Sequence, residues 1–413
     1  MHRILSSQLP QYIGETVNVA GWVHRRRLLA KVAFVVLRDR EGLLQIVCRE
    51  PVVPAEEQVV AVTGRVVANE AAPGGVELVE PVFTVLGPAE PPPVELFRPE
   101  LTASLPVLLD HAAVTLRHPQ RQKVFAASAR AVGAFRRALD ERGFTEVFTP
   151  KIVGSATESG ANVFEIDYFG AKAYLAQSPQ FYKQTMVGVF ERVYEVGPVF
   201  RAEPHDTSRH LATYTSLDAE LGFIQSHRDV MAVLTEVIRA MVGAVEAGGF
   251  GGIRLPDEVP VLHFRDALRI AGAPEDEPDL APEHERALGE WAAQRHGSDF
   301  VYVEGYPMRK RPFYTHPQPD EPRWSNSFDL LFRGLELVTG GQRLHRHEDY
   351  LAAVRDSGQD AEALETYLEA FRHGMPPHGG FAIGLERFMA RVTGAANVRE
   401  TTLFPRDLHR VAP

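Results

Sequence analysis

Residues 379–387 read Gly-Gly-Phe-Ala-Ile-Gly-Leu-Glu-Arg, a glycine-rich run that ends on an acid and a base. Glycine lets a backbone approach a ligand closely. Gly384 leads into an expected helix that carries Glu386 and Arg387, and a helix N-terminus beside a fixed positive charge favours an anion. A glycine-rich turn that caps an ordinary helix explains the run at least as well when it is taken alone.

A second segment upstream also offers an arginine. Phe200-Arg201-Ala202-Glu203 follows the expected strand Val193–Phe200, and a polar loop then leads to Arg209 and His210. A sheet holds an arginine placed at the end of a strand, and the planar guanidinium group suits a phosphate or a carboxylate.

Two further segments carry isolated charges. Asp329 and Glu336 interrupt apolar strand sequence and suit Mg²⁺, or are acids at an exposed sheet edge.

Gln180 and Lys183 lie three residues apart at an expected helix start and therefore share one face. Lys183 is a compact charge suited to a carboxylate, although an ordinary surface lysine fits as well. Expected helices cover Gln120–Arg142, Arg228–Ala247 and Glu362–Arg372. Strand runs with segregated helices predict an α+β domain built on an antiparallel β-sheet flanked by helices.

The first 87 residues have a different texture. Five short apolar runs separated by turn signals predict a five-stranded barrel of OB type, and other small β-barrels fit almost as well. The runs are Val17–His24, Ala33–Asp39, Leu43–Cys48, Gln58–Ala68 and Val76–Leu86. We therefore predict a barrel domain at 1–87, a proline-containing hinge at 88–117 and a catalytic domain at 118–413, with a probable insertion at 249–299.

Composition excludes several classes of protein. No apolar run approaches the roughly 18 residues that span a bilayer, and no signal-peptide pattern opens the chain, so we expect a cytoplasmic protein without a membrane partner. The single cysteine, Cys48, excludes an internal disulfide and a cysteine-based zinc site. The net charge of −10 disfavours a general nucleic-acid binder but permits RNA binding through local basic patches.

Three segments in this order resemble the signature motifs of class II aminoacyl-tRNA synthetases. Arg142–Pro150 resembles motif 1, Phe200–Glu203 with Arg209–Glu220 resembles motif 2, and Gly380–Arg387 resembles motif 3. Along nearly the whole chain the order and spacing are similar to aspartyl-tRNA synthetases of the compact archaeal type. The resemblance implies a homodimer in which an OB-fold anticodon-binding domain precedes the class II catalytic domain.

The resemblance also implies roles for single residues. Arg201, joining ATP to aspartate, and Arg387, on the γ-phosphate, would be the catalytic residues. ATP would contact Arg201, Glu203, Arg209, His210, Leu211, Tyr214, Glu336, Gly384 and Arg387; aspartate would contact Glu158, Gln180, Lys183, Arg201, Thr339 and Arg343; and Mg²⁺ would contact Glu336, Thr339 and Asp329. The family usually has a glutamate before the motif 2 aromatic residue, where this chain has Ala212-Thr213, so the strength of adenine recognition stays open.

The barrel carries a candidate surface for single-stranded RNA. Arg25 and Arg26, with Arg27, form a local basic patch, while Phe34 offers a stacking ring and Gln45 a hydrogen-bonding amide. The resemblance adds Glu80 and Pro81 to the anticodon-binding set. A core position for Phe34 and a solvated run of charge are equally good explanations.

The implied reaction is ATP-dependent activation of L-aspartate to aspartyl-adenylate, followed by transfer to tRNA(Asp). Compact enzymes of this type often also charge tRNA(Asn) for later hand-over to an amidotransferase, and we favour that form. Pro81 points instead to strict use of tRNA(Asp). Lys183 argues against an asparaginyl-tRNA synthetase, the barrel argues against a paralogue that does not use tRNA, and intact motifs argue against an inactive RNA binder.

Overall fold

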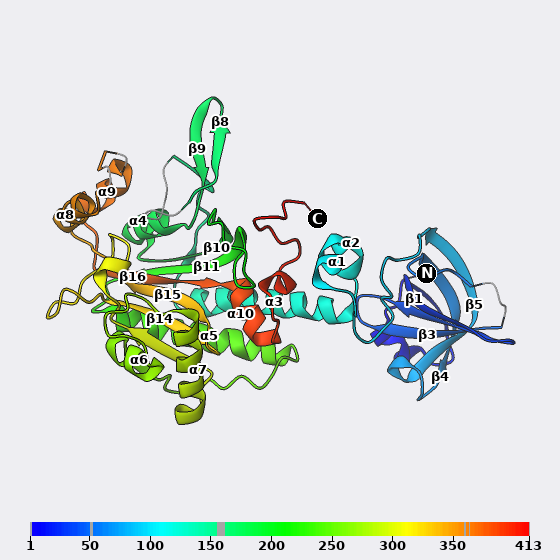
Figure 1. Cartoon of the computed structure of the whole chain (residues 1–413). Helices are drawn as coiled ribbons and strands as arrows, with labels where there is room; N and C mark the ends of the chain where they lie inside the picture. The colour runs from blue at the N-terminus through cyan, green and yellow to red at the C-terminus, as the bar shows by residue number, and fades with distance from the viewer. Residues whose placement is uncertain (1, 50–52, 155–161, 359–360, 363, 413) are drawn as a thin grey trace. The chain divides into compact units, whose positions relative to one another are not determined.

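The computed structural model describes residues 2–49, 53–154, 162–358, 361, 362 and 364–412. The expected aspartate contact Glu158 lies outside the described residues. The chain divides into two compact units, Met1–Arg121 and Gln122–Pro413, each with its own sheet (Figure 1). No helix among the described residues is both long and apolar enough to cross a bilayer.

The first unit contains a closed five-stranded barrel, which confirms the OB-type prediction. Its strands are ordered β1-β2-β3-β5-β4, and alternate side chains such as Val19, Val35 and Ile46 fill the interior. The strands are β1 (Thr16–Leu28), β2 (Ala33–Arg38), β3 (Leu43–Cys48), β4 (Val59–Ala68) and β5 (Val76–Gly87), and the 3₁₀ helices η1 (Ser6–Tyr12) and η2 (Pro73–Gly75) accompany them.

Part of the predicted hinge is helical. The segment 88–117 contains α1 (Leu105–Asp110) and α2 (Ala112–Thr115). Arg117 at its end donates to the buried Glu57 of the barrel unit at 3.0 Å, and Arg38 donates to both oxygens of the same carboxylate. This ion pair fastens the end of the segment to the barrel.

The second unit is built on an eight-stranded sheet ordered β12-β13-β14-β15-β16-β11-β10-β6. Its strands are β6 (Thr145–Glu146), β10 (Arg192–Phe200), β11 (Thr213–Gly222), β12 (Val261–His263), β13 (Phe300–Glu304), β14 (Ser327–Phe332), β15 (Glu336–Gln342) and β16 (His378–Gly384). The prediction of an antiparallel sheet is correct for the inner strands and wrong at both edges, where β6 pairs with β10 and β12 with β13 in parallel. The sheet is therefore mixed.

The predicted insertion explains one of these parallel edges. A parallel pair needs a crossover connection. Helices α6 (Phe264–Ala271) and α7 (Pro282–His296) provide it between β12 and β13. The segment 249–299 therefore contributes an edge strand and two helices to the central sheet of this unit.

The remaining helices cover the sheet and extend from it (Figure 1). Side chains of α3 (Pro119–Asp140) and α5 (His227–Ala247) form a large core with one sheet face, through residues such as Phe135, Leu234 and Phe381. The other elements are α4 (Gln180–Phe190), α8 (His347–Ser357), α9 (Glu365–Arg372), α10 (Leu385–Thr393), η3 (Met308–Lys310), η4 (Val398–Thr401) and a three-stranded sheet of β7 (Ile152–Val153), β9 (Ala171–Leu175) and β8 (Glu165–Tyr168). The opposite face of the large sheet carries the polar residues of β11, which are Ser216, Asp218 and Glu220.

Candidate active site

Strand β11 separates the core from the site by its two-residue period. Leu217 and Ala219 belong to the hydrophobic core, whereas Ser216, Asp218 and Glu220 alternate with them and face the other side. The polar residues are nonetheless buried, because neighbouring strands and α4 surround them. This polar face forms the floor of the candidate site.

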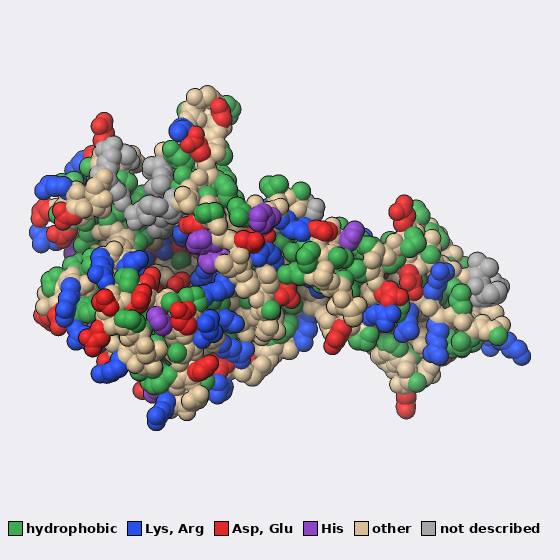
Figure 2. All heavy atoms as spheres, in the orientation of Figure 1, with side chains coloured by type: hydrophobic (Ala, Val, Ile, Leu, Met, Phe, Trp, Pro, Cys, Tyr) green, Lys and Arg blue, Asp and Glu red, His purple; other side chains and the backbone are tan. Residues whose placement is uncertain are grey.

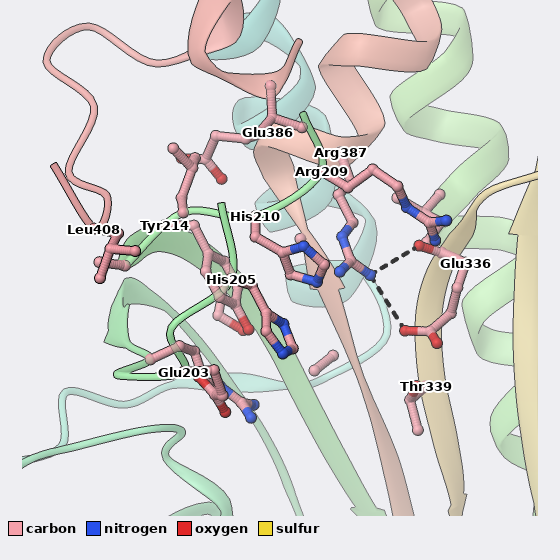
Figure 3. A pocket seen from close by; sticks show the side chains of 18 residues that line it. Glu203, His205, Arg209, His210, Tyr214, Glu336, Thr339, Glu386, Arg387 and Leu408 are labelled. Carbon is pink, nitrogen blue, oxygen red and sulfur yellow. Dashed lines mark hydrogen bonds and ion pairs between the residues drawn. The ribbon is translucent and has the colours of Figure 1, made fainter. Parts of the chain in front are cut away.

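A cavity of about 320 Å³ opens over this floor (Figure 3). Its wall includes the complete ATP set that the sequence predicts, brought together from the loop after β10 and from β11, β15, β16 and α10. The predicted residues in the wall are Arg201, Glu203, Arg209, His210, Leu211, Tyr214, Glu336, Gly384 and Arg387, joined by Thr339. The motif resemblance therefore selects residues that converge in space, although they are spread over almost 190 positions of the chain (201 to 387).

Arg209 and Arg387 lie side by side in this wall and face Glu336 (Figure 3). Arg387 donates from Nη1 to the carbonyl oxygen of Glu336 at 3.2 Å and to its Oε1 at 3.3 Å. The side chain of Glu336 remains 40% exposed, so this contact leaves the carboxylate open to the cavity.

The three predicted metal-binding residues lie close together, but only two of them line the cavity. Glu336 and Thr339 line the cavity, and Asp329 pairs with Thr339 across β14 and β15. Asp329 is buried in the middle of the sheet, so the alternative of an exposed edge acid is wrong, but its carboxylate accepts from Arg311 at 3.0 Å. Burial raises the pKa of Asp329, while Arg311 opposes that rise. Among the described residues no cluster of three or more His, Cys, Asp or Glu side chains suits a metal ion.

His210 is neutral in this environment. Burial, with the nearby charge of Arg387, lowers its pKa to about 4. Its ring packs edge-on against His205 at 4.8 Å between centroids, and His205 also lines the cavity. The positive potential of the cavity therefore comes from its arginines.

Sequence reasoning did not assign Glu386 a role. Both of its carboxylate oxygens accept the backbone N–H of Thr215, at 3.0 and 3.1 Å, which ties α10 to β11. Burial raises its pKa to about 7. The cavity wall also contains Ser216 and Ala382, which lie within motifs 2 and 3 but had no assigned role, and Val398 and Leu408, which lie outside the three motifs. Leu408 comes from the C-terminal segment, where the sequence gives no local signal of a site.

The predicted aspartate contacts Lys183 and Arg343 form a buried ionic cluster. Lys183 is 1% exposed, so the surface-lysine alternative is wrong, and its Nζ lies 3.1 Å from Asp218 and 3.3 Å from Glu220. Arg343 donates from Nε to Glu220 at 2.9 Å and from Nη2 to the carbonyl oxygen of Gly380 at 3.1 Å. Burial alone would raise the pKa of Glu220, but Arg343 and Lys183 outweigh it, and the pKa lies below its usual value.

Glycine in β16 makes room for this cluster. The run that resembled a turn is a strand up to Gly384, which caps α10 as expected. A Cβ on Gly380 would lie 2.0 Å from Oε2 of Glu220. A larger residue at position 380 would clash with Glu220. Gly380 is therefore required by the packing of the protein itself, whereas the sequence suggested close approach of a ligand.

Gln180 belongs to a supporting network behind the cluster. It donates to Gln184 at 2.9 Å, and Gln184 donates in turn to the hydroxyl of Tyr350 at 2.9 Å. Tyr367 donates to Gln184 at 2.9 Å, and its hydroxyl oxygen lies 3.0 Å from that of Tyr350. These buried hydrogen bonds connect α4 to α8 and α9.

On the barrel, the predicted RNA-binding residues occupy the outer surface. Phe34 is half-buried and is absent from the interior cluster of alternate residues, so its assignment to the core is wrong. Gln45 donates to Glu77 at 2.8 Å, Arg25 lies 4.9 Å from the ring of Phe97, and Arg26 is exposed. Basic and acidic side chains are interspersed on the face of this unit seen in Figure 2.

Glu80 and Pro81 form a bulge in β5. Thr63 pairs with Val82 and Arg65 with Val79, so two residues of β5 face one of β4. Glu80 has a positive φ of 56° and pairs with Arg65 at 3.1 Å. Proline cannot donate to a strand ladder, and a bulge is a position where it does not need to. Pro81 therefore fits its backbone position.

Comparison with known proteins assigns the chain to a family. The family described as tRNA synthetases class II (D, K and N) matches residues 104–408, and an OB-fold nucleic acid binding domain matches residues 17–86. The chain belongs to the class II tRNA synthetases. Among class II synthetases it is 46% identical to the aspartate–tRNA(Asp/Asn) ligase of Thermus thermophilus, with both chains covered completely, and 45% identical to that of Deinococcus radiodurans, covering 100% of this chain and 99% of the relative.

Solved structures of class II synthetases show the same architecture. An asparaginyl-tRNA synthetase from Pyrococcus horikoshii, complexed with asparaginyl-adenylate, gives a TM-score of 0.91 at 29% identity and full coverage of both chains. An aspartyl-tRNA synthetase from Entamoeba histolytica gives 0.87 at 27% identity, covering 100% of this chain and 93% of that one. The shared fold accommodates both amino acids, so the choice between them depends on side chains.

Proposed function

We propose that this chain is a non-discriminating aspartate–tRNA(Asp/Asn) ligase. The buried pair of cations, Lys183 and Arg343, carries the choice of amino acid. Ser216 lines the ATP cavity and donates to Asp218, which contacts Lys183, so the pair adjoins the cavity floor. Asp218 and Glu220 already balance the charge of both cations, but an ammonium and a guanidinium group donate charge-assisted hydrogen bonds to an aspartate carboxylate, and such bonds are roughly twice as strong as those between neutral groups. The cluster therefore favours aspartate over asparagine.

The cavity suits in-line transfer at the α-phosphate of ATP. The aspartate carboxylate attacks the α-phosphorus and pyrophosphate leaves; the terminal ribose hydroxyl of tRNA then attacks the adenylate and AMP leaves. Arg201 would neutralise charge on the α-phosphate and Arg387 on the γ-phosphate. Orientation and charge neutralisation supply most of the rate in such reactions, and little acid–base chemistry is required of the protein.

Mg²⁺ would be held by Glu336 and Thr339 in the cavity wall, with Asp329 behind them. The pairing of Asp329 with Arg311 assigns it a supporting place. One or two carboxylates completed by phosphate oxygens are a usual Mg²⁺ environment, and the open carboxylate of Glu336 fits it. The ion would supply positive charge to the polyphosphate.

Partner macromolecules would engage other surfaces. The outer face of the barrel, with Phe34, Gln45 and the arginines, would read the anticodon by stacking and hydrogen bonding. The segment Arg142–Pro150 would form a homodimer interface, and Phe148 within it is 80% exposed, as an apolar contact residue would be in an isolated chain. In a cytoplasmic setting, misacylated tRNA(Asn) would pass to an amidotransferase.

The decisive test is aminoacylation of purified tRNA(Asp) and tRNA(Asn) transcripts with radioactive aspartate. We expect both to be charged at comparable kcat/KM. The strict tRNA(Asp) enzyme is the second candidate, and Pro81 favours it. A preference of a hundredfold or more for tRNA(Asp) would establish that candidate and overturn our proposal.

A further inference from the structure

We propose that Glu285 is a positioning residue that holds Arg209 against the polyphosphate end of the ATP cavity. The inference rests on the proposed ATP site and assigns a task to a residue outside the three motifs. Glu285 lies in the first turn of α7, within the segment 249–299. Its side chain is 7% exposed, although the neighbouring Glu283 is exposed.

The contacts of Glu285 join two parts of the cavity wall. Nη2 of Arg209 donates to both carboxylate oxygens, at 3.0 and 2.8 Å. Oε2 also accepts the backbone N–H of Glu336 at 3.0 Å. The buried carboxylate of Glu285 thus fixes two groups. One is the guanidinium of Arg209, and the other is the backbone of Glu336, whose side chain opens to the cavity.

Glu285 engages only Nη2 of Arg209 among the described residues, so Nη1 remains for a ligand. The Nε of Arg209 is buried and has no hydrogen-bond partner among the described residues, and the side chain lines the cavity. An arginine that follows a polar loop has many rotamers, and fixing it before ATP arrives lowers the entropic cost of binding. The planar fork then presents its remaining N–H groups in a set direction.

Charge balance supports the same role. Arg209 and Arg387 line the cavity, and Arg391 lies close to Arg209. Burial and the charge of Arg209 lower the pKa of Arg391, and Glu285 opposes this effect. Without Glu285, repulsion would drive the flexible Arg209 toward solvent. The segment 249–299 therefore contributes a residue to the active site as well as an edge to the sheet.

The test compares E285Q with E283Q, a matched exposed control in the same helical turn. Glutamine keeps the size of the side chain and can still accept the N–H of Glu336. We expect the Kd for ATP, measured by calorimetry, and the KM for ATP in pyrophosphate exchange to rise on the order of tenfold in E285Q. The KM for aspartate and all constants of E283Q should stay at wild-type values.

Two further variants separate positioning from stability. E285D retains the charge and should weaken ATP binding less than E285Q does. In an R209A background, E285Q should add no further loss, because Glu285 acts through Arg209. Unchanged or tighter ATP binding by folded E285Q would overturn the inference. So would a loss of ATP affinity from E285Q in the R209A background as large as its loss in the wild-type background.

Failure of the proposed function has a different signature. A wild-type chain that binds ATP but shows no aspartate-dependent exchange would refute the amino-acid assignment, while the calorimetric comparison would still decide the role of Glu285. If E285Q does not fold, E285D and R209A remain: the inference requires both to weaken ATP binding, and wild-type affinity in R209A would refute it.

Discussion

The two ends of the candidate active site, which we propose to bind ATP and aspartate, use cationic side chains in different ways. At the ATP end, Arg387 borders an open cavity and contacts a glutamate that is 40% exposed. At the aspartate end, Lys183 and Arg343 are 1% and 6% exposed and joined to buried Asp218 and Glu220. Removing a charge at the open end affects the ligand, whereas removing one at the closed end also leaves the protein with an unbalanced buried charge.

Lys183→Leu should have the largest effect. It removes the cation that we propose to contact aspartate and leaves Asp218 without its ion-pair partner. We expect aspartate-dependent pyrophosphate exchange to fall at least about a thousandfold and the free energy of unfolding to fall by about 3 kcal/mol. Lys172→Leu, at an exposed pair on β9, is the control and should change neither quantity. Normal exchange with aspartate in Lys183→Leu would refute the aspartate assignment.

Arg387→Ala should affect activity and spare stability. A donor aimed at developing charge contributes on the order of a hundredfold in rate, so exchange should fall by about that factor. Because Arg387 is partly exposed, the melting temperature of the Arg387→Ala variant should remain close to that of the wild type. A loss of stability equal to that of Lys183→Leu would remove the difference between the two ends.

Glu386 predicts a pH dependence of stability at the ATP end. Its pKa is raised from 4.5 to about 7 in the folded chain, so the folded state holds a proton that the unfolded state releases. Its contribution is fully present below pH 4.5 and declines as the pH rises to about 7, by up to about 3 kcal/mol. In denaturant titrations from pH 5 to 8, Glu386→Gln should lose less stability than the wild type; parallel curves would contradict the shift.

Tyr350→Phe should have the smallest effect. It removes the hydroxyl that accepts from Gln184 and contacts the hydroxyl of Tyr367, behind the proposed aspartate end. The loss should be about 1 kcal/mol in unfolding free energy, with a rise of only a few fold in the KM for aspartate. A large change in the KM for ATP instead would show that this network supports the other end of the site.

The strands of the barrel and the residues of the ATP cavity were accessible from sequence. Alternation of apolar residues sets the barrel strands because each strand must bury one face. The motifs selected the predicted ATP set because Arg201 stands at a strand end and Arg387 follows a helix cap, and these local features fix where each side chain points. The described residues place all of that set in one cavity.

Local pattern did not reveal the partners of these residues. Asp218 and Glu220 are two carboxylates in an apolar strand, and Glu285 stands in an ordinary helical turn. Their roles depend on ion pairs with Lys183, Arg343 and Arg209, which lie far away in the chain. The parallel edges of the sheet were missed for the same reason, since strand direction follows from the route of the intervening helices.

By itself, then, the sequence determined which segments become strands and helices and which charged groups stand at their ends, because those properties depend on neighbours a few residues apart. The tertiary structure alone decided which charges are neutralised and which remain open to a ligand. Buried carboxylates balance Lys183 and Arg343, whereas Arg387 faces a cavity. That difference arises from burial and from contacts between distant segments, because both set the local dielectric and the partner of each charge.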